Sequence, residues 1–195
     1  MGSRDPSRGC PGLVSRDAPA MVPFHVRHTD AVVTLIGTVF AEYGMTFDPD
    51  GFDADLRDVH GHYVAGGGMF VVLVDAGEVI GTAAAVPRSD TACEIKRVYL
   101  RAAYRGKRYG RALIEHVLAW ATARGFHEVV AWSDVRLGTA HRVYERLGFQ
   151  VFGERSVEDI DRSREYGFRL RLSMPSRQAP GSPAPAECGG LGWSL

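Results

Sequence analysis

The part of this 195-residue chain with the clearest chemical potential is a short loop with four cations and two glycines. It follows an apolar segment, EIKRVYL, precedes a segment with helical periodicity, and consists of Arg105, Gly106, Lys107, Arg108, Tyr109, Gly110 and Arg111. A loop that enters a helix presents unpaired backbone N–H groups and the positive end of the helix dipole. The sequence therefore predicts an anion site, in particular one for a pyrophosphate. A solvated basic loop that caps a helix is the alternative.

The spacing of the glycines excludes two common phosphate-binding loops. The pattern GxxxxGK[ST], which binds nucleoside triphosphates with magnesium, is absent. The dinucleotide pattern GxGxxG is absent as well, because only Gly106 and Gly110 are available.

The loop does resemble motif A, R/Q-x-x-G-x-G/A, of the GCN5-related N-acetyltransferase (GNAT) superfamily, whose members bind acetyl-CoA. In YLRAAYRGKRYGRAL, Arg105 takes the R/Q position and Gly110 the last glycine, while Arg108 stands where the middle glycine is usual. A left-handed backbone would cost an arginine about 1 kcal/mol or more. We therefore expect an ordinary helical or bridge conformation at Arg108, with its side chain turned outward.

A second segment resembles motif B of the same superfamily, A-x-x-L-Y-x-x-x-G-F. The segment is AHRVYERLGF, from Ala140 to Phe149, with valine at the leucine position. The resemblance does not extend to an Asn often found three residues before the alanine, because Leu137 is there. Two motifs in the right order identify the chain as similar to this superfamily over about residues 22–173.

The resemblance implies acetyl transfer from acetyl-CoA to an amine, and it suggests an acid and a base. Supplying a neutral alkyl amine at pH 7 costs about 4 kcal/mol, since its pKa is near 10, and a nearby carboxylate can take the proton. Glu94 is the candidate base; the alternative is an edge-strand Glu paired with Lys96 or Arg97. Tyr144 matches the superfamily's general acid, which protonates the departing sulfur; the alternative is a tyrosine that only packs.

The resemblance also implies the cofactor contacts. The Val98 amide is the expected oxyanion donor, where its strand splays from the neighbouring strand, and the backbone at Val98 and Leu100 is expected to pair with the pantetheine arm. The predicted cofactor-binding residues are Val98, Tyr99, Leu100, Arg105, Gly106, Lys107, Arg108, Tyr109, Gly110, Arg111 and Ala140. We expect no metal site and no Ser-His-Asp arrangement, and we interpret His116, His127 and His141 as surface or core histidines.

The elements that must position these residues alternate between strand and helix. We expect a strand over PFHVRH, a helix that Thr29 and Asp30 cap, and a weaker helical piece over residues 53–59. Gly66, Gly67 and Gly68 are expected to form a flexible connection. The later elements are strands 69–74, 79–87 and 91–100, helix 110–124, a parallel strand 128–133, helix 138–147, and the antiparallel pair QVFGERS and YGFRLRL. The prediction is an α/β (α+β mixed sheet) single domain with the GNAT acyl-CoA N-acyltransferase fold, β-α-α-β-β-β-α-β-α-β-β.

Composition sets the remaining expectations. Net charge is zero, so nothing global favours nucleic acid or an anionic membrane, and there is no apolar run of 18 residues. Cys10, Cys93 and Cys188 are an odd, widely spaced set, which favours reduced thiols and a cytoplasmic protein. We expect disordered tails at 1–20 and 174–195, a domain at 21–173, and a monomer or homodimer.

The acceptor is left open by the sequence. Residues 42–58 contain six acidic residues, Glu42, Asp48, Asp50, Asp53, Asp55 and Asp58. If they face the cleft, together with the acidic segment 157–161, the acceptor is a small cationic amine; a solvated acidic face is the alternative. An α-amine or lysine of a protein is a second acceptor class. A sensor that binds acetyl-CoA without turnover is a rival hypothesis, motivated by Arg108 and Leu137.

Overall fold

The computed structural model describes residues 18–173, so that the predicted tails lie outside the described residues except at 18–20. Seven strands form one sheet in the order β1-β2-β3-β4-β5-β7-β6, and every neighbouring pair is antiparallel except β4 and β5. The strands are β1 (Ala20–Pro23), β2 (Met69–Asp75), β3 (Glu78–Pro87), β4 (Ala92–Leu100), β5 (Glu128–Asp134), β6 (Gln150–Ser156) and β7 (Arg164–Arg171). The helices are α1 (Thr29–Glu42), α2 (Tyr109–Ala123) and α3 (Gly138–Arg146), with short helical turns η1 (Val26–His28), η2 (Ala54–Arg57), η3 (His60–Val64) and η4 (Ala102–Tyr104).

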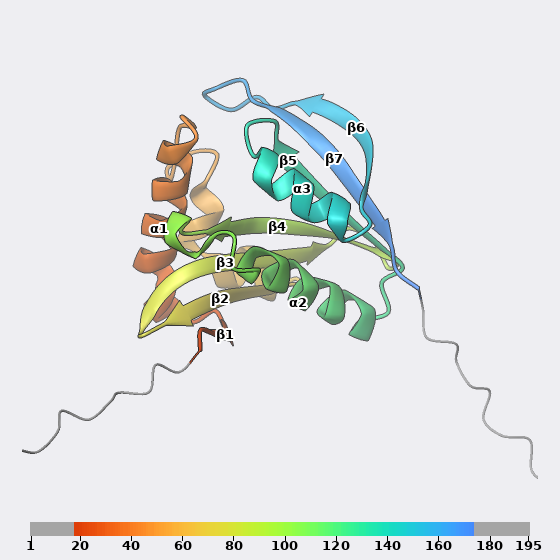
Figure 1. Ribbon diagram of the computed structural model, residues 1–195, viewed down its shortest axis with the longest axis horizontal. Coiled ribbons are helices and arrows are strands. Elements are labelled where there is room, and N and C mark those ends of the chain that lie inside the picture. The colour runs from red at the N-terminus through yellow and green to blue at the C-terminus, as the bar shows by residue number, and fades with distance from the viewer. Residues whose placement is uncertain (1–17, 174–195) are drawn as a thin grey trace, which may run out of the picture.

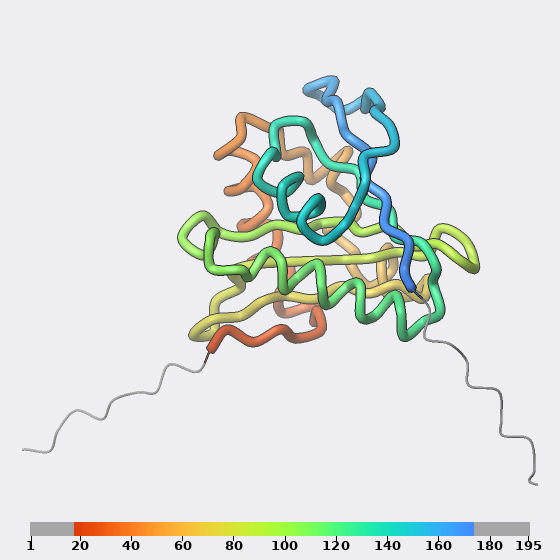
Figure 2. Tube along the Cα trace, turned by 45° about the vertical axis from the view of Figure 1, so that its right-hand side comes forward, coloured from red at the N-terminus to blue at the C-terminus, as the bar shows by residue number. Residues whose placement is uncertain are grey.

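Helices cover both faces of the sheet (Figures 1 and 2). Helices α2 and α3 lie on one face, and α1 lies on the other with η2 and η3. Successive strand residues point to opposite faces, so β2 places Val71 and Leu73 in the core under α2 and Phe70 and Val72 in the core under α1. Helix α2 crosses between the parallel strands β4 and β5, as a parallel connection requires. The predicted mixed fold is therefore confirmed.

The sequence misjudged three local features of the N-terminal half. The first strand ends at Pro23, and Val26 lies in η1 with 74% of its surface exposed; the His25 side chain accepts the Arg27 N–H and so starts that turn. Thr29 does not cap α1, because its hydroxyl donates to Val26 O. The weak helix predicted at 53–59 is only η2, and a single π-turn, η3, follows it.

The glycine run before β2 is more constrained than a flexible connection. Gly67 has φ = 82°, in the left-handed region. A Cβ on Gly68 would fall well inside van der Waals contact with the carbonyl oxygens of Ala85 and Tyr63. Gly68 therefore lets η3 lie directly against the end of β3.

Strand β4 contains an irregularity that separates it from β5. Its register with β3 shifts between Thr82 and Ala84, and Arg97 in the opposing segment has φ = 52°. Pairing between β4 and β5 ends at Ile95 and Ala131, although β5 continues to pair with β7 as far as Asp134. Such a bulge bends and twists its strand, so a gap opens between β4 and β5 from residue 96 onward.

Arg97 is also the residue whose side chain ties this bulge to the opposite layer. The guanidinium reaches Asp53 with Nη1 2.6 Å from Oδ1, and Asp55 with Nε 3.0 Å from Oδ2. The Arg97 carbonyl accepts the Thr82 hydroxyl at 2.7 Å. Because the Arg97 side chain is only 12% exposed, its charge depends on these two carboxylates for compensation.

Replacing Gly68 with alanine should destabilise the protein. The added Cβ has no room between two backbone carbonyl oxygens, and we expect the free energy of unfolding in urea to fall by about 1–3 kcal/mol. Gly66→Ala is the matched control, because nothing lies within 4 Å of its Cβ position and its φ is outside the left-handed region. That change should raise stability by up to about 1 kcal/mol. Equal effects of the two changes would contradict the proposed close contact.

Removing one carboxylate from Arg97 should be costly. Asp53→Asn leaves a buried guanidinium with one carboxylate, and we expect a loss of about 3 kcal/mol in the free energy of unfolding. Asp50→Asn breaks an ion pair with Arg57 in which the aspartate is 75% exposed, against 2% for Asp53, and it should change stability by less than about 1 kcal/mol. Chemical denaturation of both variants tests the contrast, and comparable losses would show that burial of this pair does not matter.

Candidate active site

Two cavities meet at the gap between β4 and β5. The first, with about 1460 Å³ of open space, follows the beginning of α2 and one side of α3. The second, with about 1080 Å³, lies below the loop 157–163 that joins β6 and β7. Both are lined by Val98, Tyr99, Leu137 and Ala140. A long ligand in the first cavity would therefore bring its end to the second.

The loop before α2 offers an array of main-chain donors. The backbone N–H groups of residues 106–111 lie just before and within the first turn of α2, where an α-helix leaves its N–H groups without intrahelical acceptors. Gly106 and Arg108 have φ values of 77° and 68°, and alternation of this kind turns successive N–H groups toward one concavity. The expectation for Arg108 is half wrong. Its side chain is exposed as predicted, but its backbone is left-handed, because the turn needs this conformation even without a glycine.

The cationic side chains of this loop are largely engaged elsewhere. Arg105 donates to Leu100 O at 3.1 Å and to Glu42 at 2.6 Å. Arg111 pairs with Glu115 at 2.8 Å. The anion site is therefore built chiefly from backbone donors at the start of a 15-residue helix.

The first cavity gathers most, but not all, of the predicted cofactor residues. Those that line it are Val98, Tyr99, Leu100, Arg105, Gly106, Arg108, Gly110, Arg111 and Ala140. Lys107 and Tyr109 do not; both contact the ring of Tyr104 instead. Two cations that sequence reasoning missed, Arg142 and Arg146, line this cavity from α3.

The unpaired edge of β4 supplies the route between the cavities. Beyond Ile95, the edge that faces β5 has no strand partner, while the other edge still pairs with β3 as far as Leu100. The carbonyls of Arg97 and Leu100 already accept from Thr82 and Arg105, but the remaining backbone groups on this edge can pair with an extended, amide-containing chain such as the pantetheine arm of coenzyme A. Together with the main-chain donors at the start of α2, this edge fits the coenzyme.

Glu94 lines the second cavity and also forms ion pairs. The structure is therefore compatible with both hypotheses, a catalytic base and a glutamate that only pairs with cations. Its side chain is 6% exposed, with Arg88 Nη1 at 3.3 Å and Lys96 Nζ at 3.7 Å from its two oxygens. Arg97, the other predicted partner, is occupied by the aspartates of η2 and its flank. Glu94 is thus held in place by two half-exposed cations.

Tyr144 is buried beside the gap and lines the second cavity. Its ring stacks on Phe168 and meets Phe149 edge-on, each with centroids 5.1 Å apart. Among the described residues its hydroxyl has no hydrogen-bond partner. Burial, and to a smaller extent Tyr99, raises the pKa of Tyr144 well above its ordinary value, so the phenol keeps its proton at neutral pH.

The acidic residues of segment 42–58 are divided between surface and interior, since Glu42, Asp50 and Asp58 are exposed and Asp53 is buried, and most of them form ion pairs. Glu42 binds Arg105, Asp50 binds Arg57, and Asp53 and Asp55 bind Arg97. Of this group only Asp48 and Asp53 line the second cavity. The expectation of a solvated acidic face is therefore wrong for Asp53, which is 1% exposed.

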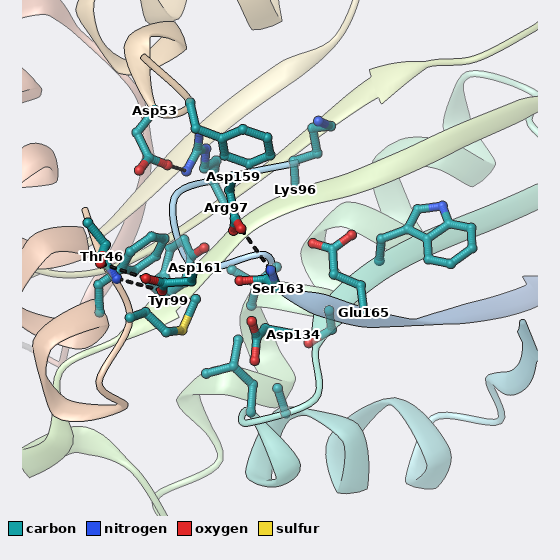
Figure 3. A pocket seen from close by; sticks show the side chains of 18 of the residues that line it. Thr46, Asp53, Lys96, Arg97, Tyr99, Asp134, Asp159, Asp161, Ser163 and Glu165 are labelled. Carbon is teal, nitrogen blue, oxygen red and sulfur yellow. Dashed lines mark hydrogen bonds and ion pairs between the residues drawn. The ribbon is translucent and has the colours of Figure 1, made fainter. Parts of the chain in front are cut away.

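The loop 157–163 closes over the second cavity through a separate network. Asp161 accepts the Thr46 N–H at 2.8 Å, and Arg136 bridges Asp134 at 2.7 Å and Asp161 at 3.3 Å. Figure 3 shows the carboxylates of Asp134, Asp159, Asp161 and Glu165 around one space. Sequence reasoning missed Arg136, because nothing in its surroundings in the chain indicates a contact with residues 25 and 92 positions away.

A second pair that the sequence did not predict is Ser133 and His141. Ser133 Oγ lies 3.2 Å from His141 Nε2, and both residues are less than 10% exposed. The carboxylate of Asp134 does not complete a triad, since it is bound by Arg136. His141 is therefore buried, as expected of a core histidine, but its contact with Ser133 was not predicted.

Other features of the described residues bear on the class of protein. No helix among them is long and apolar enough to cross a membrane, and no cluster of three or more His, Cys, Asp or Glu side chains in residues 18–173 could hold a metal ion. Burial raises the pKa of the Cys93 thiol to about 12. Cys10 and Cys188 lie outside the described residues.

Known proteins with similar sequences include proteins named as N-acetyltransferases. An N-acetyltransferase of Escherichia coli, YjgM, which is itself uncharacterised, is 28% identical over 143 residues, covering 70% of this chain and 85% of that protein. N-acetylaspartate synthetase of Danio rerio is 33% identical over 102 residues. This match covers 51% of the chain and only 36% of the synthetase.

Solved structures share the fold. An acetyltransferase from Staphylococcus aureus superposes with a TM-score of 0.72 at 14% identity, over 80% of this chain and 100% of that one. The protein yncA of Salmonella typhimurium, solved with acetyl-CoA, gives a TM-score of 0.67 at 20% identity, over 85% and 99%. The family model described as "Acetyltransferase (GNAT) family" matches residues 35–149. Because this match takes in more than half of the chain and both predicted motifs, the chain belongs to the GNAT family of acetyltransferases.

Proposed function

We propose that the protein transfers the acetyl group of acetyl-CoA to a small primary amine by direct attack. The observation that carries the proposal is the meeting of the two cavities at the β4–β5 gap, with a donor array at the far end of one and Tyr144 in the other. When bound, acetyl-CoA supplies the acetyl group as a reactive thioester. A cytoplasmic location and a monomer or homodimer are part of this proposal.

Each candidate residue has a role consistent with its surroundings. The backbone donors of residues 106–111 hold the pyrophosphate. The Val98 N–H, at the unpaired stretch of β4, stabilises charge on the carbonyl oxygen. The Tyr144 hydroxyl, protonated at neutral pH, gives its proton to the departing sulfur. Glu94 is a candidate for proton removal from the acceptor, directly or through water.

The charge of the second cavity supports a cationic acceptor. Its lining includes seven acidic residues, Asp48, Asp53, Glu94, Asp134, Asp159, Asp161 and Glu165. Lys96, Arg97 and Arg155 oppose them within the lining, and Arg88 and Arg136 pair with Glu94, Asp134 and Asp161 from outside it, so that carboxylates remain in excess. An excess of one sign in a cleft concentrates ligands of the opposite sign. A polyamine or a similar small cation fits this field better than an anion.

An amino acid with a carboxylate is the second candidate acceptor. It is favoured by the similarity to N-acetylaspartate synthetase over half of the chain. Within this cavity Lys96 and Arg155 are each 43% exposed and could meet a carboxylate. Both already contact a glutamate, however, Glu94 and Glu165 respectively, which weakens this candidate.

A panel of acceptors tests the proposed function. Release of free thiol from acetyl-CoA would be followed with spermidine, 2-phenylethylamine, L-aspartate and a lysine-containing peptide. We expect the highest kcat/KM for spermidine, about tenfold above 2-phenylethylamine at low salt, and a decline of this preference as salt screens the cavity. A preference for aspartate would favour the second candidate. Binding of acetyl-CoA without thiol release on any amine would favour a sensor.

Tyr144→Phe should separate chemistry from stability. Loss of the hydroxyl removes the general acid, so kcat should fall about 100-fold while the KM for acetyl-CoA stays the same. Thermal stability should not change, because the hydroxyl has no partner among the described residues. Tyr166→Phe is the control, since Tyr166 packs in the same core without lining either cavity. A Tyr144→Phe enzyme with full kcat would leave only a packing role.

A further inference from the structure

A buried polar pair at the gap between β4 and β5, Ser133 and His141, has no role in the function proposed above. Ser133 lies near the end of β5, is 7% exposed and lines the second cavity. His141 lies on α3, is 9% exposed and places Nε2 3.2 Å from Ser133 Oγ. A serine at a cavity wall with an imidazole directly behind it is an arrangement that can move a proton away from the cavity.

We propose that Ser133 and His141 relay the proton of the acceptor amine. In this relay an N–H bond of the ammonium breaks as an O–H bond forms at Ser133, while the original Ser133 O–H bond breaks as an N–H bond forms at His141 Nε2. The ammonium becomes a neutral amine and the imidazole becomes imidazolium, which later loses the proton to solvent. The inference rests on the proposed acetyl transfer and names a route for its proton.

The position of Ser133 favours it over Glu94 for this step. In β5, Val129 and Ala131 point into the core under α3, and Ser133 has the same parity, so it faces α3 as well. There it shares the cavity wall with Tyr144, whereas Glu94 points to the other face of the sheet and is held by two cations. Of the two candidates, Ser133 is therefore the one on the face of the sheet that carries Tyr144.

The surroundings of His141 suit a proton acceptor. Its ring packs against Phe168 and Tyr166, with centroids 5.1 and 5.6 Å away. Burial lowers the pKa of His141, against weaker opposing effects of the Asp134 backbone, Glu145 and the Asp134 carboxylate. The ring is thus neutral at pH 7, and Nε2 can accept a proton in the tautomer that carries hydrogen on Nδ1.

Two charged groups near His141, Glu145 and Asp134, oppose the lowering of its pKa. Glu145 is one turn further along α3, and Asp134 approaches from β5 but is paired with Arg136. From β7 the titratable group that faces the ring is Tyr166. None of these replaces Ser133 as the partner of Nε2.

Helix α3 also links the relay to the acid. His141 and Tyr144 are three residues apart, so they lie on one face of the helix, and both rings pack on Phe168. One rigid element therefore holds the group that receives the acceptor's proton and the group that protonates the leaving sulfur. This arrangement keeps the two proton transfers in fixed relation to the gap.

The test measures the pH dependence of thiol release for His141→Gln and Ser133→Ala, using whichever amine of the panel the wild-type protein acetylates fastest. Gln can keep a hydrogen bond to Ser133 but cannot take up a proton near neutral pH. We expect kcat at pH 7 to fall about 100-fold in each variant, with the KM for acetyl-CoA unchanged. The wild-type rate should decline as pH falls through the lowered pKa of His141, and this inflection should disappear in both variants.

His127→Gln is the control, because His127 is exposed and lines neither cavity; it should keep the rate and the inflection. Thermal unfolding checks that the variants fold, and Ser133→Ala, the smaller change, still gives the test if His141→Gln does not. A wild-type enzyme that turns over while both variants keep its rate and pH profile would overturn the relay and leave the proposed function standing. No thiol release by the wild-type protein with any amine would overturn the proposed function itself.

Discussion

The buried ion pairs of Arg97 with Asp53 and Asp55 are the constraint on which the site depends. Backbone pairing between β4 and β5 would otherwise continue, because β5 extends in register with β7 well past the point where β4 leaves it. The bulge at Arg97 ends that pairing, and its side chain anchors the bulge to the layer that contains η2. A buried ion pair is weak evidence for net stability, but removing one partner is strongly unfavourable. The pair therefore specifies where the strand bends more than it strengthens the sheet.

One gap then serves two purposes. It frees a strand edge for pairing with an extended cofactor, and it joins a cavity lined by the α2 loop to a cavity in whose lining carboxylates outnumber cations. The fixed positive end of α2 and the N–H groups of residues 106–111 lie at one end of this path. The acidic residues lie at the other end. An anionic donor and a cationic acceptor are thus drawn to opposite sides of the same gap by groups that need no rearrangement.

The elements that could be predicted from the sequence are those that local apolar periodicity and residue spacing determine. Helix α2, its end at Gly125 and the parallel strand β5 follow from apolar spacing and from glycine, and the two motifs identified the family. Two features depend on contacts between distant segments, a third depends on how a helix packs on a strand, and none of them was predictable. Arg97 is 44 residues from Asp53, and Arg136 reaches Gly44 and Asp161. Ser133 and His141 lie near each other in the chain, but only the packing of α3 on β5 brings their polar atoms together.

Arg97 and Arg108 show how backbone strain is distributed around this site. Both are non-glycine residues in the left-handed region, where each costs on the order of 1 kcal/mol. At Arg97 the side chain compensates, since its guanidinium binds two carboxylates and its carbonyl accepts the Thr82 hydroxyl. At Arg108 the carbonyl accepts the Ala112 N–H at 3.0 Å, but the exposed side chain makes no hydrogen bond or ion pair within the described residues that would offset the strain. Strained residues of this kind persist where the surrounding structure dictates their conformation. At Arg108 the conformation is set by the turn that points the N–H groups of residues 106–111 into one concavity. The strained residue therefore lies where its conformation helps to form a binding surface.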